Sequence, residues 1–214
     1  MAGDPKVSIV NVALGQLGQE PVVDLSAASL AASNATVKIL RVLDDARDAV
    51  LARHGFLCAM EYAELQPSNL AGSWKYPTVY LLPGGALEVW EIGGFPLTDY
   101  YSTFWRPRWE VGTRDTDQGP QKIIRARNAD AGLNVAYTRR ASWGALETLV
   151  RDAVAYEAAA RAAYSVTGDV QRASQLEKRA QEKIAAAIAK EGTQEGGQEP
   201  LAPSIPAALR NYSR

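Results

Sequence analysis

Hydrophobic residues recur with helical spacing over the first fifty positions of the chain. A first helix is predicted near the N-terminus, and Gly18 can end it in the left-handed conformation. Its apolar face has the i, i+3, i+4, i+7 spacing: Val10, Ala13, Leu14 and Leu17. A second helix is predicted over about residues 32–53, with an apolar face made of Ile39, Val42, Leu43, Ala46 and Val50.

The second helix also carries a run of charged residues that lies largely opposite its apolar face. These residues are Lys38, Arg41, Asp44, Asp45, Arg47 and Asp48. Charge pairs one turn apart on a helix contribute only about 0.2–0.5 kcal/mol each, so the run is most simply a solvated face. A subunit interface is the alternative interpretation.

The middle of the chain, residues 56–140, changes to short runs with strand propensity. Strands are predicted at residues 78–82, 87–92, 122–125 and 134–138. Pro83 separates the first two of them, and Gly84 and Gly85 can supply the positive φ angles of a tight hairpin. The second strand has apolar residues on both faces, which leaves one face for a neighbouring chain to cover. We therefore expect a small antiparallel sheet inserted between helices.

Helical spacing returns after residue 141. Ser142 can cap a helix that runs to about Ser165. Its apolar stripe consists of Leu146, Leu149, Ala153, Tyr156, Ala160 and Ala163. Gly168 interrupts the pattern, and Asp169 can cap a further helix, whose stripe consists of Ala173, Leu176, Ala180, Ile184 and Ala187. Two long helices joined by a short turn that contains glycine should pack antiparallel.

The end of the chain has the composition of a tether. From Glu191 it is rich in Gly, Gln, Glu and Pro, which cannot bury enough apolar surface to fold alone, so residues 191–214 should form a flexible extended arm. The arm's tip offers apolar and charged groups to a partner: Ile205, Leu209, Arg210, Tyr212 and Arg214. The expected fold is α+β and mainly helical. An antiparallel helical bundle is formed by residues 1–55 and 141–190, and the small sheet is inserted at 56–140.

Composition and charge narrow the classes of function. The chain of 214 residues has 23 Lys and Arg against 24 Asp and Glu, and its formal net charge of -1 gives no general attraction to DNA or to an anionic membrane. Cys58 is the only cysteine, which excludes an intrachain disulfide, and we expect it to be a small buried hydrophobic residue. No apolar stretch reaches the roughly 20 residues that cross a bilayer, and no signal peptide is recognisable.

No catalytic or metal-binding constellation can be assembled from the sequence. His54 is the only histidine, and at the end of the second helix it is expected to interact with that helix's terminal carbonyl groups. Asp44, Asp45 and Asp48 lack the glycine turn and the glutamate of a calcium loop, and no phosphate-binding glycine loop is present. We therefore predict that the protein is not an enzyme and holds no cofactor or metal.

Two tryptophans bracket two arginines near the middle of the chain, at Trp105, Arg106, Arg108 and Trp109. Both residue types are favoured as anchors of protein interfaces, so this run is a candidate interface loop. A place in the protein core explains the run equally well. Binding of single-stranded nucleic acid is less favoured, because the residues that follow are acidic and do not continue a basic groove.

The order of these features resembles the head-to-tail connector proteins of tailed bacteriophages, the tail tubular protein A or head-tail adaptor family. Residues 8–25 are similar to its opening, a short helix ending in Leu-Gly and an extended Pro-Val segment. Residues 54–59 stand where the family has the turn His-Pro-Trp-x-Phe-Ala, although its Pro, Trp and Phe are replaced here. Further on, residues 74–76 and 80–83 look like its aromatic and Tyr-x-Leu-Pro motifs.

This resemblance implies a structural virion protein of the phage neck, made in the cytoplasm of the host bacterium. The family forms a ring, usually of twelve subunits, which sits beneath the portal protein and continues the DNA channel toward the tail. Its C-terminal arm reaches the portal, and its β insertion faces neighbouring subunits or the next tail or neck protein. DNA would pass without sequence-specific binding. Two alternatives remain: an adaptor or scaffold unrelated to phages, and another neck component such as a stopper.

Overall fold

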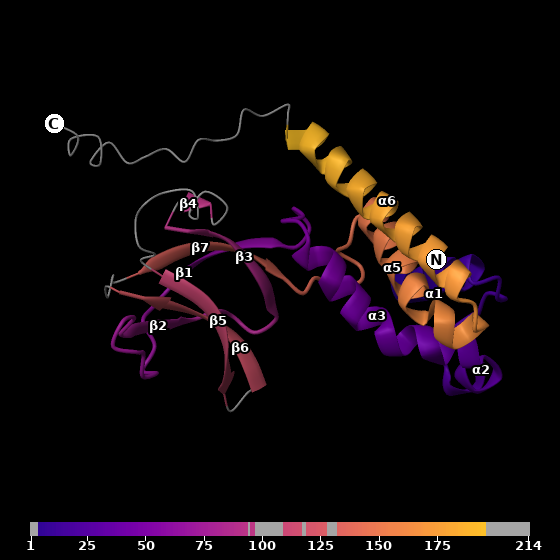
Figure 1. Ribbon diagram of the computed structural model, residues 1–214, viewed down its shortest axis with the longest axis horizontal. Helices are drawn as coiled ribbons and strands as arrows, with labels where there is room; N and C mark the ends of the chain where they lie inside the picture. Colours follow the sequence, from indigo (N-terminus) through magenta and orange to yellow (C-terminus); the bar gives the residue numbers. More distant parts are fainter. Residues whose placement is uncertain (1–3, 94, 97–108, 117–118, 128–131, 196–214) are drawn as a thin grey trace.

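The computed structural model describes residues 4–93, 95–96, 109–116, 119–127 and 132–195. The chain is α+β, with 47% helix and 25% strand. Figure 1 shows an elongated molecule in which the helices gather at one end and the strands at the other. We call these two parts the helical half and the β half.

The helical half is built around one central helix. Its helices are α1 (Pro5–Gln16), α2 (Ala27–Ala32), α3 (Asn34–Ala52), α5 (Thr148–Thr167) and α6 (Val170–Glu195). Helix α5 packs against α1, α3 and α6, and it is buried on most of its circumference. Its many alanines allow the surrounding helices to approach closely, and each is also a strong helix former. The predicted stripe of α5 was therefore too narrow.

Most of the predicted helix faces and caps are confirmed. Gly18 follows α1 with φ +68°, and the N–H of Gln19 donates to the carbonyl of Leu14 at 2.9 Å, which completes a Schellman cap. On α3, Ile39, Leu43, Ala46 and Val50 are all buried. Gly168 ends α5 with φ +69°, and Asp169 accepts the N–H of Gln171 at 2.8 Å. The two helices on either side of this turn pack antiparallel, as expected (Figure 1).

The start of α5 differs from the prediction. The helix begins at Thr148, six residues after the expected cap at Ser142. The carbonyl of Ser142 instead accepts the N–H of Ala145 at 3.0 Å, which closes a tight turn. This turn lets the side chain of Leu146 enter the helical core before the helix starts. The short helix α2 was not predicted.

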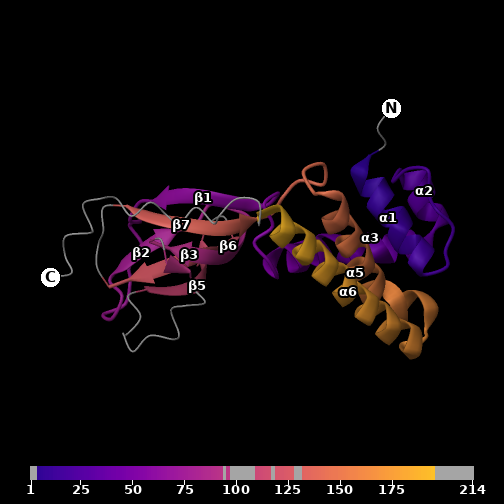
Figure 2. The ribbon, with the colours of Figure 1, turned by 90° about the horizontal axis from the view of Figure 1, so that it is seen from above.

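The β half contains two antiparallel sheets. Its strands are β1 (Met60–Leu65), β2 (Thr78–Leu81), β3 (Ala86–Ile92), β4 (Phe95–Pro96), β5 (Trp109–Thr116), β6 (Gly119–Ala126) and β7 (Leu133–Arg139). One sheet has the strand order β1-β7-β3-β4 and the other has the order β2-β6-β5. Side chains from both sheets form one core, including Tyr80, Leu82 and Ile124 from one side and Val89, Val135 and Tyr137 from the other. Figure 2 shows this half from a second direction.

The predicted fold, a helical bundle with one small inserted sheet, is wrong. The four predicted strands exist, but β1, β4 and β5 join them to make two sheets with their own core. The predicted hairpin also does not form, because β2 pairs with β6 while β3 pairs with β7 and β4. Residues 83–85 instead lead the chain from one sheet to the other, and Gly85 has φ +83° there. The order of strands in space depends on which faces they bury together, which local spacing does not encode.

The C-terminal helix is longer than predicted. Helix α6 continues to Glu195, whereas the extended arm was expected to begin at residue 191. The carboxylate of Glu191 is buried, where it accepts the N–H of Leu57 and lies 3.6 Å from Nε2 of His54. His54 thus lies beside α6, and its expected interaction with the carbonyl end of its own helix stays a prediction. The proposed portal-binding residues lie outside the described residues: Ile205, Leu209, Arg210, Tyr212 and Arg214.

Candidate functional site

The candidate interface loop is only partly described. Trp105, Arg106 and Arg108 lie outside the residues that the structure describes. Trp109 is the first residue of β5, where it pairs with Ala126 and packs against the core of the β half. Trp109 is therefore partly a core residue, and a role of the preceding residues at an interface stays a prediction.

An ion pair joins the helical half to the β half. Arg140 follows β7 directly, and its Nε donates to Oδ2 of Asp48 in α3 at 2.9 Å. Its Nη2 donates to the same oxygen. The hydrogen bond from the guanidinium to Asp48 raises the pKa of Arg140 above its ordinary value, so the arginine stays charged. The two halves are thus held together by a charged contact as well as by the chain.

The charged run on α3 is not only a solvated face. Arg41, Asp44 and Asp45 are exposed, as the pattern predicts. Arg47 is only 5% exposed, and its guanidinium lies 4.4 Å from the ring centre of Trp143. It also pairs with Asp44 at 3.0 Å. A cation over an aromatic face is attracted by the ring quadrupole, so this arginine has a structural role within the helical half, where Trp143 packs on the helical core.

The loop between β1 and β2 presents a tryptophan to the solvent. The side chain of Trp74 is 95% exposed, while that of Tyr76, two residues later, is buried. Between them the chain forms a closed turn: Ser73 N–H donates to the Tyr76 carbonyl at 2.9 Å, and Tyr76 N–H donates back to Ser73 at 3.1 Å. Trp74 and Lys75 stand at the tip of this turn, which we call the Trp74 tip.

Several contacts hold the loop below the tip against the second sheet. Arg114 of β5 donates to the carbonyl of Ala71 at 2.9 Å, and the hydroxyl of Ser68 donates to the carbonyl of Val79 in β2 at 2.8 Å. At Gly72 an added Cβ would lie 2.3 Å from the carbonyl oxygen of Tyr76, so only glycine fits this backbone. The Trp74 tip is therefore fixed in place before any partner binds.

Sequence reasoning missed this tip as a site. Trp74 entered only as part of a family motif, and the exposure of one aromatic side chain cannot be deduced from its own position in the sequence. The available signals were Gly72 and the two flanking prolines, Pro67 and Pro77, which mark a structured turn.

A groove lies at the other end of the molecule, between α1 and the segment that follows it. Its volume is about 820 Å³, and its apolar lining is Pro5, Val7, Val12, Val23 and Leu25. Val23 is 94% exposed. The side chain of Asn11 fixes this segment, since it accepts the N–H of Val22 at 2.8 Å and donates to the carbonyl of Val22 at 2.9 Å. We call this feature the α1 groove.

Charged groups surround the apolar lining of the α1 groove. Asp4, Asp24 and Arg151 all line it. Hydrogen bonds from the hydroxyls of Ser29 and Ser26 lower the pKa of Asp24, so its carboxylate stays ionised. The Nε of Arg151 is buried and has no acceptor among the described residues. An apolar group can therefore lie in the groove with a cation beside it, where the carboxylates of Asp4 and Asp24 would meet the cation.

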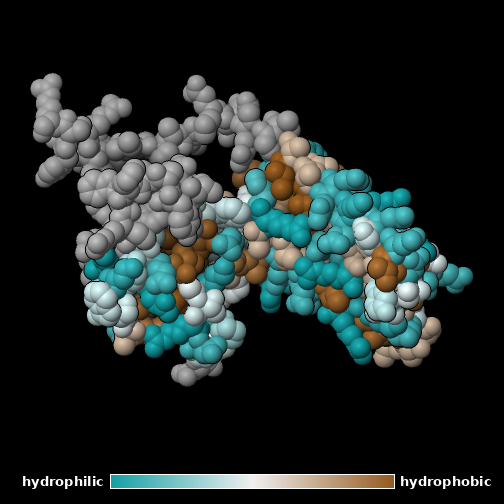
Figure 3. Space-filling model, in the orientation of Figure 1, coloured by the Kyte–Doolittle hydropathy of each residue, from teal (hydrophilic) through white to brown (hydrophobic). Residues whose placement is uncertain are grey.

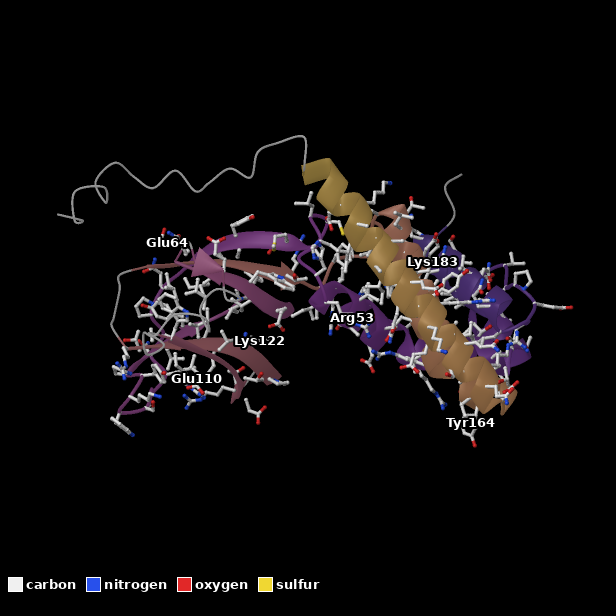
Figure 4. All side chains as sticks on the ribbon, turned by 45° about the horizontal axis from the view of Figure 1, so that its top comes forward. Arg53, Glu64, Glu110, Lys122, Tyr164 and Lys183 are labelled. Atoms are coloured by element: carbon white, nitrogen blue, oxygen red, sulfur yellow. The ribbon has the colours of Figure 1, made fainter. Side chains whose placement is uncertain are left out.

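A second groove, of about 410 Å³, lies on the helical half between α3, α5 and α6. Three of its charged groups are already paired with one another: Arg161 Nε donates to Glu157 at 2.9 Å, and Arg53 lies 3.9 Å from the same carboxylate. Figure 4 shows Arg53 in this part of the molecule. On the β half, Lys122 and Glu88 pair at 2.9 Å and tie one sheet to the other.

The described residues offer little for covalent or metal chemistry. Cys58 is half-buried, and burial raises the pKa of its thiol, which makes it a weak nucleophile. In the described part of the chain, no group of His, Cys, Asp and Glu side chains could hold a metal ion. Within the same residues, no helix has the length and apolar character to span a membrane.

The fold and its surfaces define a two-part molecule, with an exposed aromatic tip on one half and an apolar groove on the other. Figure 3 shows hydrophobic residues in separate patches on both halves, surrounded by hydrophilic ones. Comparison of the chain with protein-family models and with curated proteins gave no match.

Proposed function

We propose that this chain is a structural subunit of the head-to-tail connector of a tailed bacteriophage. Copies of it form a ring, of twelve subunits in the family that the sequence resembles, between the portal protein and the tail. The activity of such a subunit is binding, not catalysis. The observation that carries the proposal is the Trp74 tip, a fully presented aromatic anchor on a rigid loop.

The physics of interfaces supports a binding role for this tip. A large aromatic side chain left in water costs free energy that burial in a partner recovers, and tryptophan is enriched among the residues that dominate binding. A loop already held in its bound form loses little conformational entropy on association. Tyr62 of the edge strand β1 is also largely exposed, so the β half offers more than one aromatic contact to neighbours.

The elongated shape supports a connecting role. The helical half and the β half lie at opposite ends of the long axis, so one subunit can reach two different neighbours (Figures 1 and 2). In this proposal the arm that includes residues 205–214 binds the portal, and the β half meets the next tail or neck protein. With a net charge of -1, the ring would let genomic DNA pass without holding it.

The test is assembly with the portal protein encoded in the same genome. We expect the purified chain to sediment as a monomer or small oligomer, and to form rings visible by electron microscopy when the portal protein is added. We also expect its peptides in purified virions. If the chain were absent from virions and did not bind the portal protein, the proposal would be wrong, and an adaptor unrelated to phages would be favoured. Binding at a different level of the neck would favour a stopper.

A further inference from the structure

We propose that neighbouring copies of this chain contact each other through the Trp74 tip of one copy and the α1 groove of the next. This inference rests on the proposed function for its biological setting, the ring, but the contact can be tested without it. It names the surfaces that would join adjacent subunits.

The tip and the groove both expose apolar surface that could be buried by contact with the other. Trp74 is 95% exposed and Val23 is 94% exposed, so each presents apolar surface to water in the single chain. The indole of Trp74 is largely apolar, and the α1 groove has an apolar lining of Pro5, Val7, Val12, Val23 and Leu25. Seating the indole there would remove both surfaces from water at once.

The charges of the two features also match. Lys75 lies next to Trp74 at the tip, and Asp4 and Asp24 border the groove. A lysine that follows the indole into the groove would therefore meet two carboxylates, of which Asp24 is held ionised by its serine partners.

The positions of the two features place the contact between copies and not within one chain. The loop that leads into β2 lies at one end of the molecule, and the segment between α1 and α2 lies at the other (Figures 1 and 2). One chain cannot satisfy both features by itself. In the ring that we propose, each copy places its tip in the groove of the next copy, whereas an antiparallel pair in which each tip fills the other copy's groove would form a closed dimer. Such head-to-tail contacts repeat from copy to copy, and they close into a ring when the rotation between copies allows it.

The contact should be weak in isolation. A single aromatic anchor buries far less surface than a stable interface needs, so free copies would associate only transiently. Copies held side by side on a common partner act at a high effective concentration, and the same contact then becomes strong. This agrees with a subunit that assembles on a template.

Cross-linking between two single-cysteine proteins tests the contact directly. Cys58→Ser removes the only cysteine of the chain, and Lys75→Cys or Asp24→Cys is then added to separate proteins. The two proteins are mixed without any other component and treated with a short bis-maleimide, because a lysine and aspartate pair holds its Cα atoms further apart than a disulfide allows. We expect the 75–24 product in clear excess over the 75–75 and 24–24 products.

Matched controls separate this contact from random collision. Glu177→Cys places a cysteine at another exposed acidic position of the helical half, and it should give no excess with Lys75→Cys. Trp74→Ala should reduce the 75–24 product roughly tenfold, as expected for loss of an aromatic anchor. Tyr164→Ala, at an exposed aromatic residue on α5 labelled in Figure 4, should leave the yield unchanged.

The outcomes distinguish the contact from the proposed function. The contact would be overturned if Asp24→Cys and Glu177→Cys gave equal yields of cross-linked product with Lys75→Cys. It would also be overturned if Trp74→Ala left the yield of the 75–24 product unchanged. Ring formation on the portal without the 75–24 product would overturn the contact and leave the connector proposal standing. A specific 75–24 product in a chain that binds no portal would support the contact and count against the connector.

Discussion

Arg140 and Asp48 lie 92 residues apart in the sequence and form a two-point ion pair in the structure. Arg140 belongs to the end of the β half, and Asp48 belongs to helix α3 of the helical half. Arg47, the neighbour of Asp48, lies against Trp143, which packs on the helical core. The ion pair of Arg140 and Asp48 helps to fix how the two halves meet, which matters for a subunit that would contact neighbours with both ends.

Arg140→Ala should therefore lower the free energy of unfolding by about 1 kcal/mol, which is the range for a partly exposed but two-point ion pair. Urea denaturation followed by circular dichroism measures this change. Arg41→Ala, at an exposed arginine on the same helix, should change it by less than about 0.5 kcal/mol. Equal effects of the two substitutions would contradict a special role of Arg140.

The backbone below the Trp74 tip should depend on one glycine. Gly72→Ala would place a Cβ 2.3 Å from the carbonyl oxygen of Tyr76, so the loop must shift, at a cost of about 1–3 kcal/mol. Gly84→Ala is the control, because nothing lies within 4 Å of its added Cβ. We expect faster proteolysis of the loop and a changed Trp fluorescence in the first variant only. An unchanged loop in Gly72→Ala would show that the tip is not fixed as described.

The stability of the β half should depend on Tyr137 at high pH. Burial, together with a hydrogen bond to Glu61, raises the pKa of Tyr137 to about 12, from 10.0 in an unfolded chain. The hydroxyl of Tyr137 therefore stays protonated to a higher pH in the folded state than in the unfolded state. The resulting stabilisation is fully present below pH 10 and is lost as the pH rises through about 12.

Tyr137→Phe should remove this part of the pH dependence. The free energy of unfolding should then fall less steeply between about pH 10 and 12 than in the unchanged protein, in urea titrations at each pH. Tyr62→Phe is the matched control, since Tyr62 is largely exposed on β1 and its variant should follow the unchanged protein. If the free energy of unfolding fell equally steeply with pH in Tyr137→Phe and Tyr62→Phe, Tyr137 would not be the source of this pH dependence.

Two C-terminal truncations should differ in melting temperature, because only one of them removes Glu191. Ending the chain after Glu195 removes only residues 196–214 and should leave the melting temperature nearly unchanged. Ending it after Lys190 also removes the carboxylate that accepts the N–H of Leu57. The loss of this bond to a charged acceptor costs roughly 1–2 kcal/mol, which lowers the melting temperature by a few degrees.

Glu191→Ala in the full chain should reproduce the loss seen after truncation at Lys190. Differential scanning calorimetry of the three variants measures the effect. If both truncations melt alike, Glu191 does not hold α6 to the turn after α3.

Local rules in the sequence predicted the individual elements well. The spacing of Ile39, Leu43, Ala46 and Val50 predicts a helix face, and Gly18 and Asp169 predict where helices end and begin. These signals act between residues no more than a few positions apart, so they survive without the rest of the fold. The four predicted strands are correct for the same reason.

The tertiary structure alone decided how these elements combine. Nothing near β2 in the sequence shows that it pairs with β6 and not with β3, because the pairing depends on the core that both sheets build from distant side chains. The burial of Arg47 and Glu191 likewise depends on partners far along the chain. Trp74 is exposed on a loop whose contacts, at Gly72, Arg114 and Tyr76, exist only in the folded chain. Periodicity and capping are local properties that the sequence determines, whereas pairing, burial and exposure are set by contacts between residues that only the folded chain brings together.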